Sequence, residues 1–323
     1  MNNEKASVIL VGYNCLAYLD RCLSSLIESN YPNFQIIYVD NRSDDGSPEY
    51  VEKHFGKQVR TLRLERNYGF SIGCNVGAKH SDGKYLVFLN VDTIVRKTWL
   101  AELISALESD KTIGAAQSKL LQMDGKTIDS LGGFITPYGT VWSKGHGLAD
   151  NGSLRMEEIF YSKGAAMITR RDIWDHLGEF DPLYFLYFQE TDYCWRLWSS
   201  GYRVVCVPSS VVLHVGAGTS ARTPRLVKFH EARERVILLA KNHSWHDLIR
   251  YLPVTVFLQM LNAMRRLLLG DPATATSVIE GTMAAVLAVN KVWRSRKQLF
   301  GHNERERVTV TRMMLRQIGW TLR

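Results

Sequence analysis

Short apolar runs rich in β-branched residues alternate with helical segments along the first third of the chain, and this alternation most constrains the fold. The runs are short and continuous, as expected for strands that are buried on both faces. They cover residues 6–13, 34–40, 59–64 and 84–90. Helices are predicted at residues 17–29, from Ser47 and Pro48 onward, at 73–81 and at 98–108. Such alternation predicts an α/β fold with a mainly parallel sheet and helices on both of its faces.

The remaining sequence divides into a second α/β part and a helical tail. Glycine and proline punctuate residues 132–147, which predicts loops around short strands. Strands are predicted at 160–169, 204–207 and 211–215, and helices at 192–200, 226–241, 245–269 and 273–297. A chain of 323 residues, 46% of them apolar, can bury a large core. We therefore expect an α/β domain over residues 1–221 and a C-terminal helical extension over residues 222–323.

Polar side chains stand where two of the predicted strands end. Asp40 closes the second strand, and Asn90, Val91 and Asp92 follow the fourth. Ligands of such sheets bind at the carboxyl ends of the strands. A carboxylate there can accept a hydrogen bond from the imide N–H of a pyrimidine. Asp92 suits a hard divalent cation that bridges two phosphates, because such ions take one or two carboxylates and complete their shell with substrate oxygens.

A second pair of carboxylates, Glu190 and Asp192, precedes the helix predicted at 192–200. Asp192 is placed to cap the N-terminus of that helix. Glu190 would then lie outside the helix and be available for acid–base chemistry.

These segments resemble the family 2 glycosyltransferases, which use nucleotide-sugars and have the GT-A fold. The resemblance runs from about residue 6 to residue 220 and follows the family's order of motifs. The matching segments are 7–14, 39–47, 67–70, 75–77, 88–92, 164–167, 178–181, 188–192 and 213–214. Within the family the chain looks most like the rhamnosyltransferase-type branch, whose members build O-antigen, capsule or cell-wall glycans. The segments that mark this branch are 129–133 and 180–187.

The resemblance implies a role for individual residues. Residues 1–95 would form the nucleotide-binding half and residues 96–221 the acceptor half of the domain. The nucleotide-sugar site would comprise Tyr13, Asn14, Asp40, Asn67, Gly69, Phe70, Asn75, Asn90, Val91, Asp92 and Gly164. Asp92 would bind Mg²⁺ or Mn²⁺, with His214 as a second ligand. Glu190 stands at the position of the family's base, and Asp192 could share that role.

The resemblance also implies a reaction. A sugar, rhamnose in this branch, would move from a UDP- or dTDP-sugar to a hydroxyl of a glycan or lipid-linked acceptor, by metal-assisted single displacement with inversion. Other functions stay open: a transferase of another hexose, a nucleotidyltransferase, or a non-catalytic nucleotide-sugar-binding or scaffold protein. A nucleotidyltransferase would carry a basic, glycine-rich phosphate loop after the first strand, and residues 12–16 form none. A non-catalytic protein would be expected to have lost Asp92 or Glu190, and both are present.

The positive charge is concentrated in the C-terminal region. The whole chain has a formal net charge of +8, and residues 222–323 carry 18 Lys and Arg against 7 Asp and Glu. Such a region can bind nucleic acid, anionic lipid or an acidic partner. It has no zinc-finger, RNP or basic-zipper signature, so nucleic acid is not expected. Residues 252–269 are apolar but contain Arg265 and Arg266, which suits a helix at a membrane interface or one packed in a homo-oligomer.

Cysteine usage and the N-terminus bear on the compartment. The five cysteines include no Cys-x-x-Cys pair, so neither a disulfide framework nor a zinc knuckle is expected. The first apolar run is too short for a signal peptide or a transmembrane helix. We therefore expect a cytoplasmic protein, peripheral on the cytoplasmic face of the membrane.

Overall fold

A twisted ten-stranded sheet organises the molecule in the computed structural model, which describes residues 4–216, 223–300 and 310–314. Four parallel strands form one side of it: β1 (Ala6–Gly12), β2 (Phe34–Asp40), β3 (Val59–Arg63) and β4 (Tyr85–Leu89). Gly12 at the end of β1 pairs with Asp40 at the end of β2. The carboxyl ends of these strands therefore meet at one edge, as the sequence predicts.

The other side of the sheet is mixed, which the sequence did not indicate. β11 (Ala166–Arg170) runs antiparallel to β4 and to β6 (Ile113–Leu121), and β12 (Arg203–His214) runs parallel to β6. Short strands complete this side: β5 (Thr93–Val95), β7 (Ile128–Ser130) and β10 (Glu157–Glu158). A separate two-stranded sheet joins β8 (Gly133–Ile135) to β9 (Val141–Ser143).

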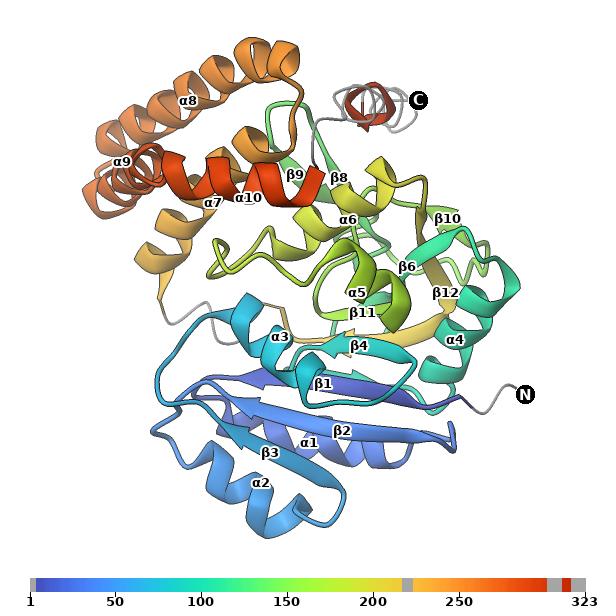
Figure 1. Cartoon of the computed structure of the whole chain (residues 1–323). Coiled ribbons are helices and arrows are strands. Elements are labelled where there is room, and N and C mark those ends of the chain that lie inside the picture. The colour runs from blue at the N-terminus through green and yellow to red at the C-terminus, as the bar shows by residue number, and fades with distance from the viewer. Residues whose placement is uncertain (1–3, 217–222, 301–309, 315–323) are drawn as a thin grey trace.

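Two hydrophobic cores cover the two faces of the sheet (Figure 1). Along β1, Val8 and Leu10 face the first core and Ile9 faces the second, as the two-residue period of a strand requires. Helices of the first core are α1 (Leu16–Ile27), α2 (Ser47–Phe55) and α4 (Trp99–Ser109). Helices of the second core are α3 (Phe70–Lys79), α5 (Arg171–Leu177), α6 (Gln189–Ser199) and α7 (Pro224–Asn242).

Several predicted elements differ from those observed. The runs predicted at 204–207 and 211–215 are one strand, β12, whose register against β6 shifts between Val207 and Val211. The strand predicted at 160–169 begins only at Ala166, and β6 and α5 were not predicted. The helix predicted at 273–297 is two helices, α9 (Pro272–Leu287) and α10 (Val289–Phe300), bent by 56°.

Helix α6 begins earlier than predicted, and this changes two assignments. Phe188, in the left-handed conformation at φ 62°, precedes the first residue, Gln189. Glu190 therefore lies in the first turn rather than outside the helix. Asp192 also lies within that turn, so the prediction that it caps the helix is wrong.

The basic C-terminal region is packed into the molecule from its first described helix. Val236, Ile237, Leu238 and Leu239 of α7 are buried in the second core. The predicted boundary after residue 221 falls outside the described residues. α8 (Trp245–Leu268) and α9 pack against α7 at the upper left of Figure 1.

A buried network of charges joins α7 to α6. The Lys241 ammonium lies 2.7 Å from Asp181 Oδ2 and 2.8 Å from Asp192 Oδ2, and its side chain is fully buried. Arg196 Nε also donates to Asp192, at 3.1 Å, and Asn242 Nδ2 donates to the other oxygen of that carboxylate at 2.8 Å. Two cations and an amide thus compensate a carboxylate that no water reaches.

Removing the ammonium from this network should destabilise the protein strongly. Lys241→Met leaves the buried carboxylates of Asp181 and Asp192 with less compensating charge, and breaking a buried pair in this way costs about 3–5 kcal/mol. The free energy of unfolding in urea, followed by circular dichroism, measures this loss. Lys228→Met is the control on the same helix: Lys228 pairs with Glu231 near the surface, so we expect a change below about 1 kcal/mol. Equal losses in both variants would contradict the assignment.

Candidate active site

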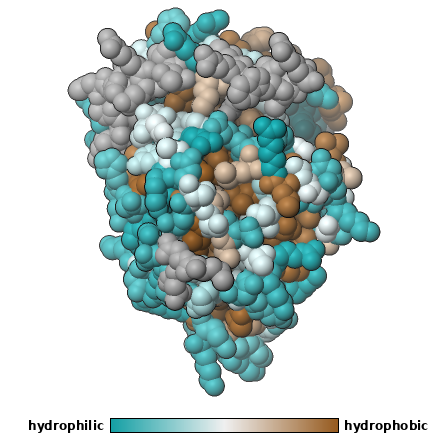
Figure 2. Space-filling view, turned by 90° about the vertical axis from the view of Figure 1, so that its right-hand side faces the viewer, coloured by the Kyte–Doolittle hydropathy of each residue, from teal (hydrophilic) through white to brown (hydrophobic). Residues whose placement is uncertain are grey.

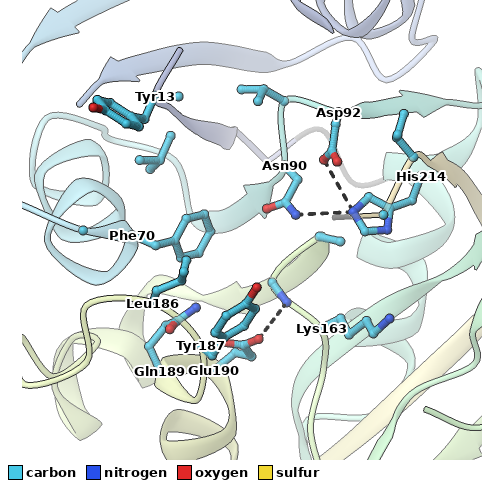
Figure 3. Close-up of a pocket in the computed structure, with 18 of the residues that line it drawn as sticks. Tyr13, Phe70, Asn90, Asp92, Lys163, Leu186, Tyr187, Gln189, Glu190 and His214 are labelled. Atoms are coloured by element: carbon cyan, nitrogen blue, oxygen red, sulfur yellow. Dashed lines mark hydrogen bonds and ion pairs between the residues drawn. The ribbon is translucent and has the colours of Figure 1, made fainter. Parts of the chain in front are cut away.

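A cavity of about 1120 Å³ opens at the carboxyl ends of β1 and β4. Predicted site residues that line it are Tyr13, Asn14, Asn67, Gly69, Phe70, Asn90, Val91, Asp92, Gly164, Glu190 and His214. Figure 3 shows two groups facing each other across this space: Asn90, Asp92 and His214 on one side, and Gln189 and Glu190 on the other. Residues more than 120 positions apart in sequence therefore share one pocket.

The loops after β1 and β2 form one wall of the pocket. Asn14, at φ 50°, donates its backbone N–H to Ser43 Oγ, and its side-chain oxygen accepts from the N–H of Asp44. Asn41 bridges to the loop before α3, because its side chain accepts from Tyr68 N and donates to Gly69 O. Asn41, which follows Asp40 in the sequence, lines the pocket and was not predicted as a site residue.

Asp40 itself is almost fully buried and is not one of the lining residues. One carboxylate oxygen accepts from the Ser43 N–H at 3.0 Å and the other from the Tyr38 hydroxyl at 3.3 Å. Asp40 thus orders the loop between β2 and α2. Its predicted bond to a pyrimidine stays a prediction.

Gly69 is required where the α3 segment approaches the loop before α6. It has φ 86°, and a Cβ at this position would lie 2.5 Å from the carbonyl oxygen of Phe185. Only glycine avoids both the strained backbone and the clash. The N–H of Phe70 donates to that same oxygen at 2.8 Å, which fixes the start of α3 against the pocket wall.

Besides Asp40, two further residues predicted for the site lie outside the pocket. Asn75 uses its amide to pair with the backbone of Phe180: Nδ2 donates to the carbonyl at 2.7 Å and Oδ1 accepts from the N–H at 3.2 Å. Asp192 is fully buried in the ion-pair network with Lys241 and Arg196. Asn75 and Asp192 are therefore structural residues in this geometry, and the proposed sharing of the base role by Asp192 is not supported.

His214, at the end of β12, lies between two carboxylates. Its Nε2 faces Asp92 Oδ1 at 3.4 Å, and its Nδ1 lies 3.0 Å from Asp129 Oδ2 (Figure 3 shows the first pair). Burial by itself lowers the pKa of His214, but the hydrogen bonds to Asp129 and Asp92 outweigh it and raise that pKa to about 9. Asp129 also contacts Lys163 Nζ at 3.3 Å. Sequence reasoning gave Asp129 no role, because only tertiary packing brings it to His214.

The residues at this side of the pocket fit a divalent cation that is shared with a substrate. No cluster of three or more His, Cys, Asp or Glu side chains arranged for a metal is found within the described ranges. Asp92 offers a carboxylate oxygen, and His214 offers Nε2 once a cation displaces the proton on that nitrogen, while Nδ1–H stays on Asp129. Mg²⁺ and similar ions are commonly held by one or two protein ligands and the phosphates of a substrate. A carboxylate on the far ring nitrogen of a metal-binding histidine is the usual supporting contact.

Glu190 is the acidic group on the other side of the pocket. Its Oε1 accepts from the backbone N–H of Gly164 at 3.5 Å, and its Oε2 is buried without a hydrogen-bond partner. Burial raises the pKa of Glu190 to about 7. A carboxyl group in this state can exchange a proton with a bound substrate near neutral pH.

Helix α7 positions the loop that carries the aromatic wall of the pocket. Glu234 Oε1 accepts from the N–H groups of Phe185 and Leu186 at 2.9 and 3.3 Å and pairs with His230 at 2.8 Å. Phe185 and Leu186 line the cavity, and Tyr187 beyond them has a positive φ. Glu234 therefore shapes the site from the helical region that the sequence set apart from it.

Comparisons with known proteins agree with this architecture. The family model described as "Glycosyl transferase family 2" matches residues 7–177. An N-acetylglucosaminyl-diphospho-decaprenol L-rhamnosyltransferase from Mycobacterium tuberculosis is 25% identical over 269 residues, which cover 76% of this chain and 87% of the relative. The O-antigen biosynthesis protein RfbC from Myxococcus xanthus is 28% identical over 202 residues, covering 59% of this chain and 16% of the relative.

A solved structure resembles the whole chain. The mannosyltransferase PcManGT from Pyrobaculum calidifontis, in complex with GDP-Man and Mn²⁺, superposes with a TM-score of 0.55 at 16% identity. The match covers 100% of this chain and 87% of the other. This likeness confirms the expected GT-A fold.

The environment of Glu190 predicts an unusual stability profile. Its carboxyl ionises near pH 7 in the folded state but near its ordinary value of 4.5 when unfolded. Protonated Glu190 therefore contributes to the stability of the folded protein, and this contribution is lost as pH rises from about 4.5 to 7. Because Gln resembles the protonated acid, Glu190→Gln should be more stable than the wild type at pH 8, by about 1–3 kcal/mol. Its advantage should shrink toward pH 5. Urea unfolding at both pH values measures it.

The exposed residue Glu65 provides the control for loss of a carboxylate. A gain of the same size and pH dependence in Glu65→Gln would contradict the assignment to burial of Glu190. So would a Glu190→Gln variant that is no more stable than the wild type at pH 8.

Proposed function

Because the chain belongs to glycosyl transferase family 2 and is a glycosyltransferase, we propose that its large pocket binds a nucleotide-diphosphate sugar and transfers the sugar to an acceptor hydroxyl with inversion. One observation carries this proposal: Asp92 and His214 line one side of the pocket, and Glu190 lines the opposite side. The first pair suits a metal-bound diphosphate, and Glu190 suits deprotonation of the acceptor.

A single base supports single displacement. Of the two carboxylates at the start of α6, only Glu190 lines the pocket, whereas Asp192 is neutralised by Lys241 and Arg196. Hydrolysis of a glycoside needs a pair of carboxyl groups, because the leaving alcohol must be protonated. A nucleoside diphosphate leaves without protonation, so one base opposite the leaving group is sufficient.

The residues of the chain divide the work in this proposal. Glu190 accepts the proton of the attacking hydroxyl, and the N–H of Gly164 holds the carboxylate in place. Asp92 and His214 would hold the cation, and Asp129 would keep the Nδ1 proton of His214. Mg²⁺ or Mn²⁺, when bound, would neutralise charge on the diphosphate as the glycosidic bond breaks. The aromatic wall formed by Phe70, Phe185 and Tyr187 limits access of water to the reacting carbon.

The relatives support a donor and an acceptor class. The mycobacterial relative is named as an L-rhamnosyltransferase that acts on a diphospho-decaprenol acceptor, and PcManGT binds GDP-Man. We propose a UDP- or dTDP-sugar donor, rhamnose as the first sugar to test, and a lipid-linked glycan as the acceptor. Hydrolysis of a panel of UDP-, dTDP- and GDP-sugars, with and without Mn²⁺, tests the donor class.

Replacement of the base should separate chemistry from binding. Glu190→Gln keeps the size of the side chain but not its basicity, so transfer should fall by about 10²–10⁴-fold. The affinity for the donor nucleotide should change little.

In the wild type, transfer should rise with pH through about 7, because the ionised carboxylate is the active form. Turnover assays across pH and titration calorimetry with UDP measure the two effects. Glu102→Gln, on α4 away from the pocket, is the control. Near-normal transfer by Glu190→Gln would refute the role.

Metal dependence forms a second test. Transfer should be lost in EDTA and restored by Mn²⁺ or Mg²⁺. In the presence of UDP, Asp92→Asn and His214→Ala should weaken Mn²⁺ binding measured by electron paramagnetic resonance. Asp129→Asn should weaken it by about 10–100-fold, as other supporting contacts do. Asp124→Asn is the matched control, because Asp124 lines the pocket but its carboxylate bonds to Thr127. Full turnover in EDTA would exclude the metal role.

A further inference from the structure

The polarity of α8 is inverted with respect to the rest of the protein. The face that it buries carries Tyr251, Thr255, Gln259 and Ala263. The face that it exposes carries Val254, Phe257, Leu261, Met264 and Leu268, with Phe257 65% and Leu268 82% exposed. A helix on a water-soluble surface normally does the opposite, with its apolar stripe against the core. The outer face of α8 is therefore built to contact something apolar.

The buried contacts of α8 are specific, so the orientation of the helix is not interchangeable. Thr255 Oγ1 donates to the carbonyl of Tyr138 at 3.0 Å. Gln259 Nε2 donates to Thr282 Oγ1 of α9 at 2.9 Å. Turning the apolar face inward would break both bonds and bury unsatisfied polar atoms.

Helix α9 also exposes apolar side chains, although its buried face is mixed. It buries mainly small residues such as Ala275, Gly281 and Ala285, together with Val278, and exposes Met283, Val286 and Leu287, the last of them at 84%. A Cβ at Gly281 would lie 2.3 Å from the carbonyl oxygen of Phe229, so glycine permits the close approach of α9 to α7. Close packing through small residues with polar bonds between helices is typical of helices whose outer surface faces lipid.

The surroundings of this apolar surface are basic. Residues 245–297 contain seven Lys and Arg against three Asp and Glu. The excess comes from the start of α10, because α8, α9 and their connection hold three Arg against three acidic residues. Trp245 and Trp293 pack together with ring centroids 5.3 Å apart, both are partly exposed, and the Arg296 guanidinium lies over Trp245 at 4.8 Å. Tryptophan beside arginine and lysine is characteristic of the border between lipid headgroups and acyl chains.

Another face of the molecule has a different distribution of polar and apolar residues. Figure 2 views the molecule from the right of Figure 1, the side away from α8 and α9. Polar residues predominate on that face, and apolar residues appear between them at its centre and along its right-hand side.

These helices are suited to lie along a bilayer rather than to cross it. No single helix among the described residues has the length and apolarity of a membrane span, and α9 with the start of α10 has them only as a pair bent by 56°. Arg250, Arg265 and Arg266 of α8 would each be costly in the centre of a bilayer. At an anionic surface each such residue is instead favourable, because it is attracted to the headgroups.

We infer that the α8–α9 hairpin is a docking surface for an anionic lipid leaflet. A second copy of the chain fits less well, because a self-complementary interface would bring together the excess positive charges of α10, which borders the hairpin where Trp293 packs on Trp245. The choice of lipid also rests on the proposed lipid-linked acceptor. Helix α7 connects the two sites: Leu226 near its start lines the pocket, and its length packs against α8 and α9. Docking would hold the pocket near the leaflet that carries the acceptor.

Co-sedimentation of the full-length protein with vesicles tests the inference. The vesicles contain phosphatidylcholine alone or with about one third phosphatidylglycerol, at low and high salt. We expect binding to the anionic vesicles, weakened by salt. The triple variant Phe257→Ser, Leu261→Ser, Leu268→Ser should bind at least about tenfold more weakly. The double variant Leu148→Ser, Leu154→Ser is the matched control, because both side chains are exposed outside the hairpin, and it should bind as the wild type does.

Two further measurements separate the outcomes. Hydrolysis of the nucleotide-sugar donor in solution should be the same in the triple variant and the wild type, which excludes misfolding. Lipid binding without any hydrolysis or transfer would refute the proposed function but keep the docking surface. Failure of the wild type to sediment with anionic vesicles would overturn the inference. A second result would also overturn it: light scattering shows that the wild type is a dimer and the triple variant a monomer, while both bind vesicles equally.

Discussion

The ion pair between Lys241 and Asp192 links the parts of this protein that must act together. It ties α7, from the C-terminal region, to α6, which carries Glu190 two residues earlier. Arg196, Asn242 and the Tyr184 hydroxyl also donate to the same carboxylate. Because the network is fully buried, its members can neither move apart nor be hydrated without a large loss of stability. The position of Glu190 in the pocket therefore depends on a helix that lies outside the family match of residues 7–177.

The two sides of the pocket handle charge in opposite ways. On one side, Asp92, His214 and Asp129 form a continuous set of charged contacts. On the other, Glu190 has one weak hydrogen bond and one buried oxygen without a partner. The first arrangement stabilises ionised groups, whereas the second destabilises one and raises its pKa toward neutrality. In the proposed function, these opposed environments would let one pocket bind a diphosphate and accept a proton at the same pH.

The inverted polarity of α8 and the exposed apolar side chains of α9 give the C-terminal region a double role. Its inner surfaces, from Glu234 to Lys241, shape the site and close the second core. Its outer surfaces expose apolar side chains of α8 and α9. If the acceptor is attached to a lipid, as proposed, one structural unit would both shape the pocket and hold it near the membrane.

The sequence by itself determined the parallel half of the sheet, most helices, the family and eleven residues of the pocket, because these depend on local periodicity and on motifs at strand ends. It could not separate Glu190 from Asp192. In a helix, residues two apart point to nearly opposite sides, but this helix begins at Gln189 because Phe188 adopts a left-handed conformation within a packed loop.

Asn75 likewise carries a family motif yet bonds to the backbone of Phe180, 105 positions away. The contacts of Asp129 with His214 and of Glu234 with the loop at Phe185 span 85 and 49 positions. Only tertiary structure decides such contacts, because side-chain direction and long-range packing leave no periodic trace in the sequence.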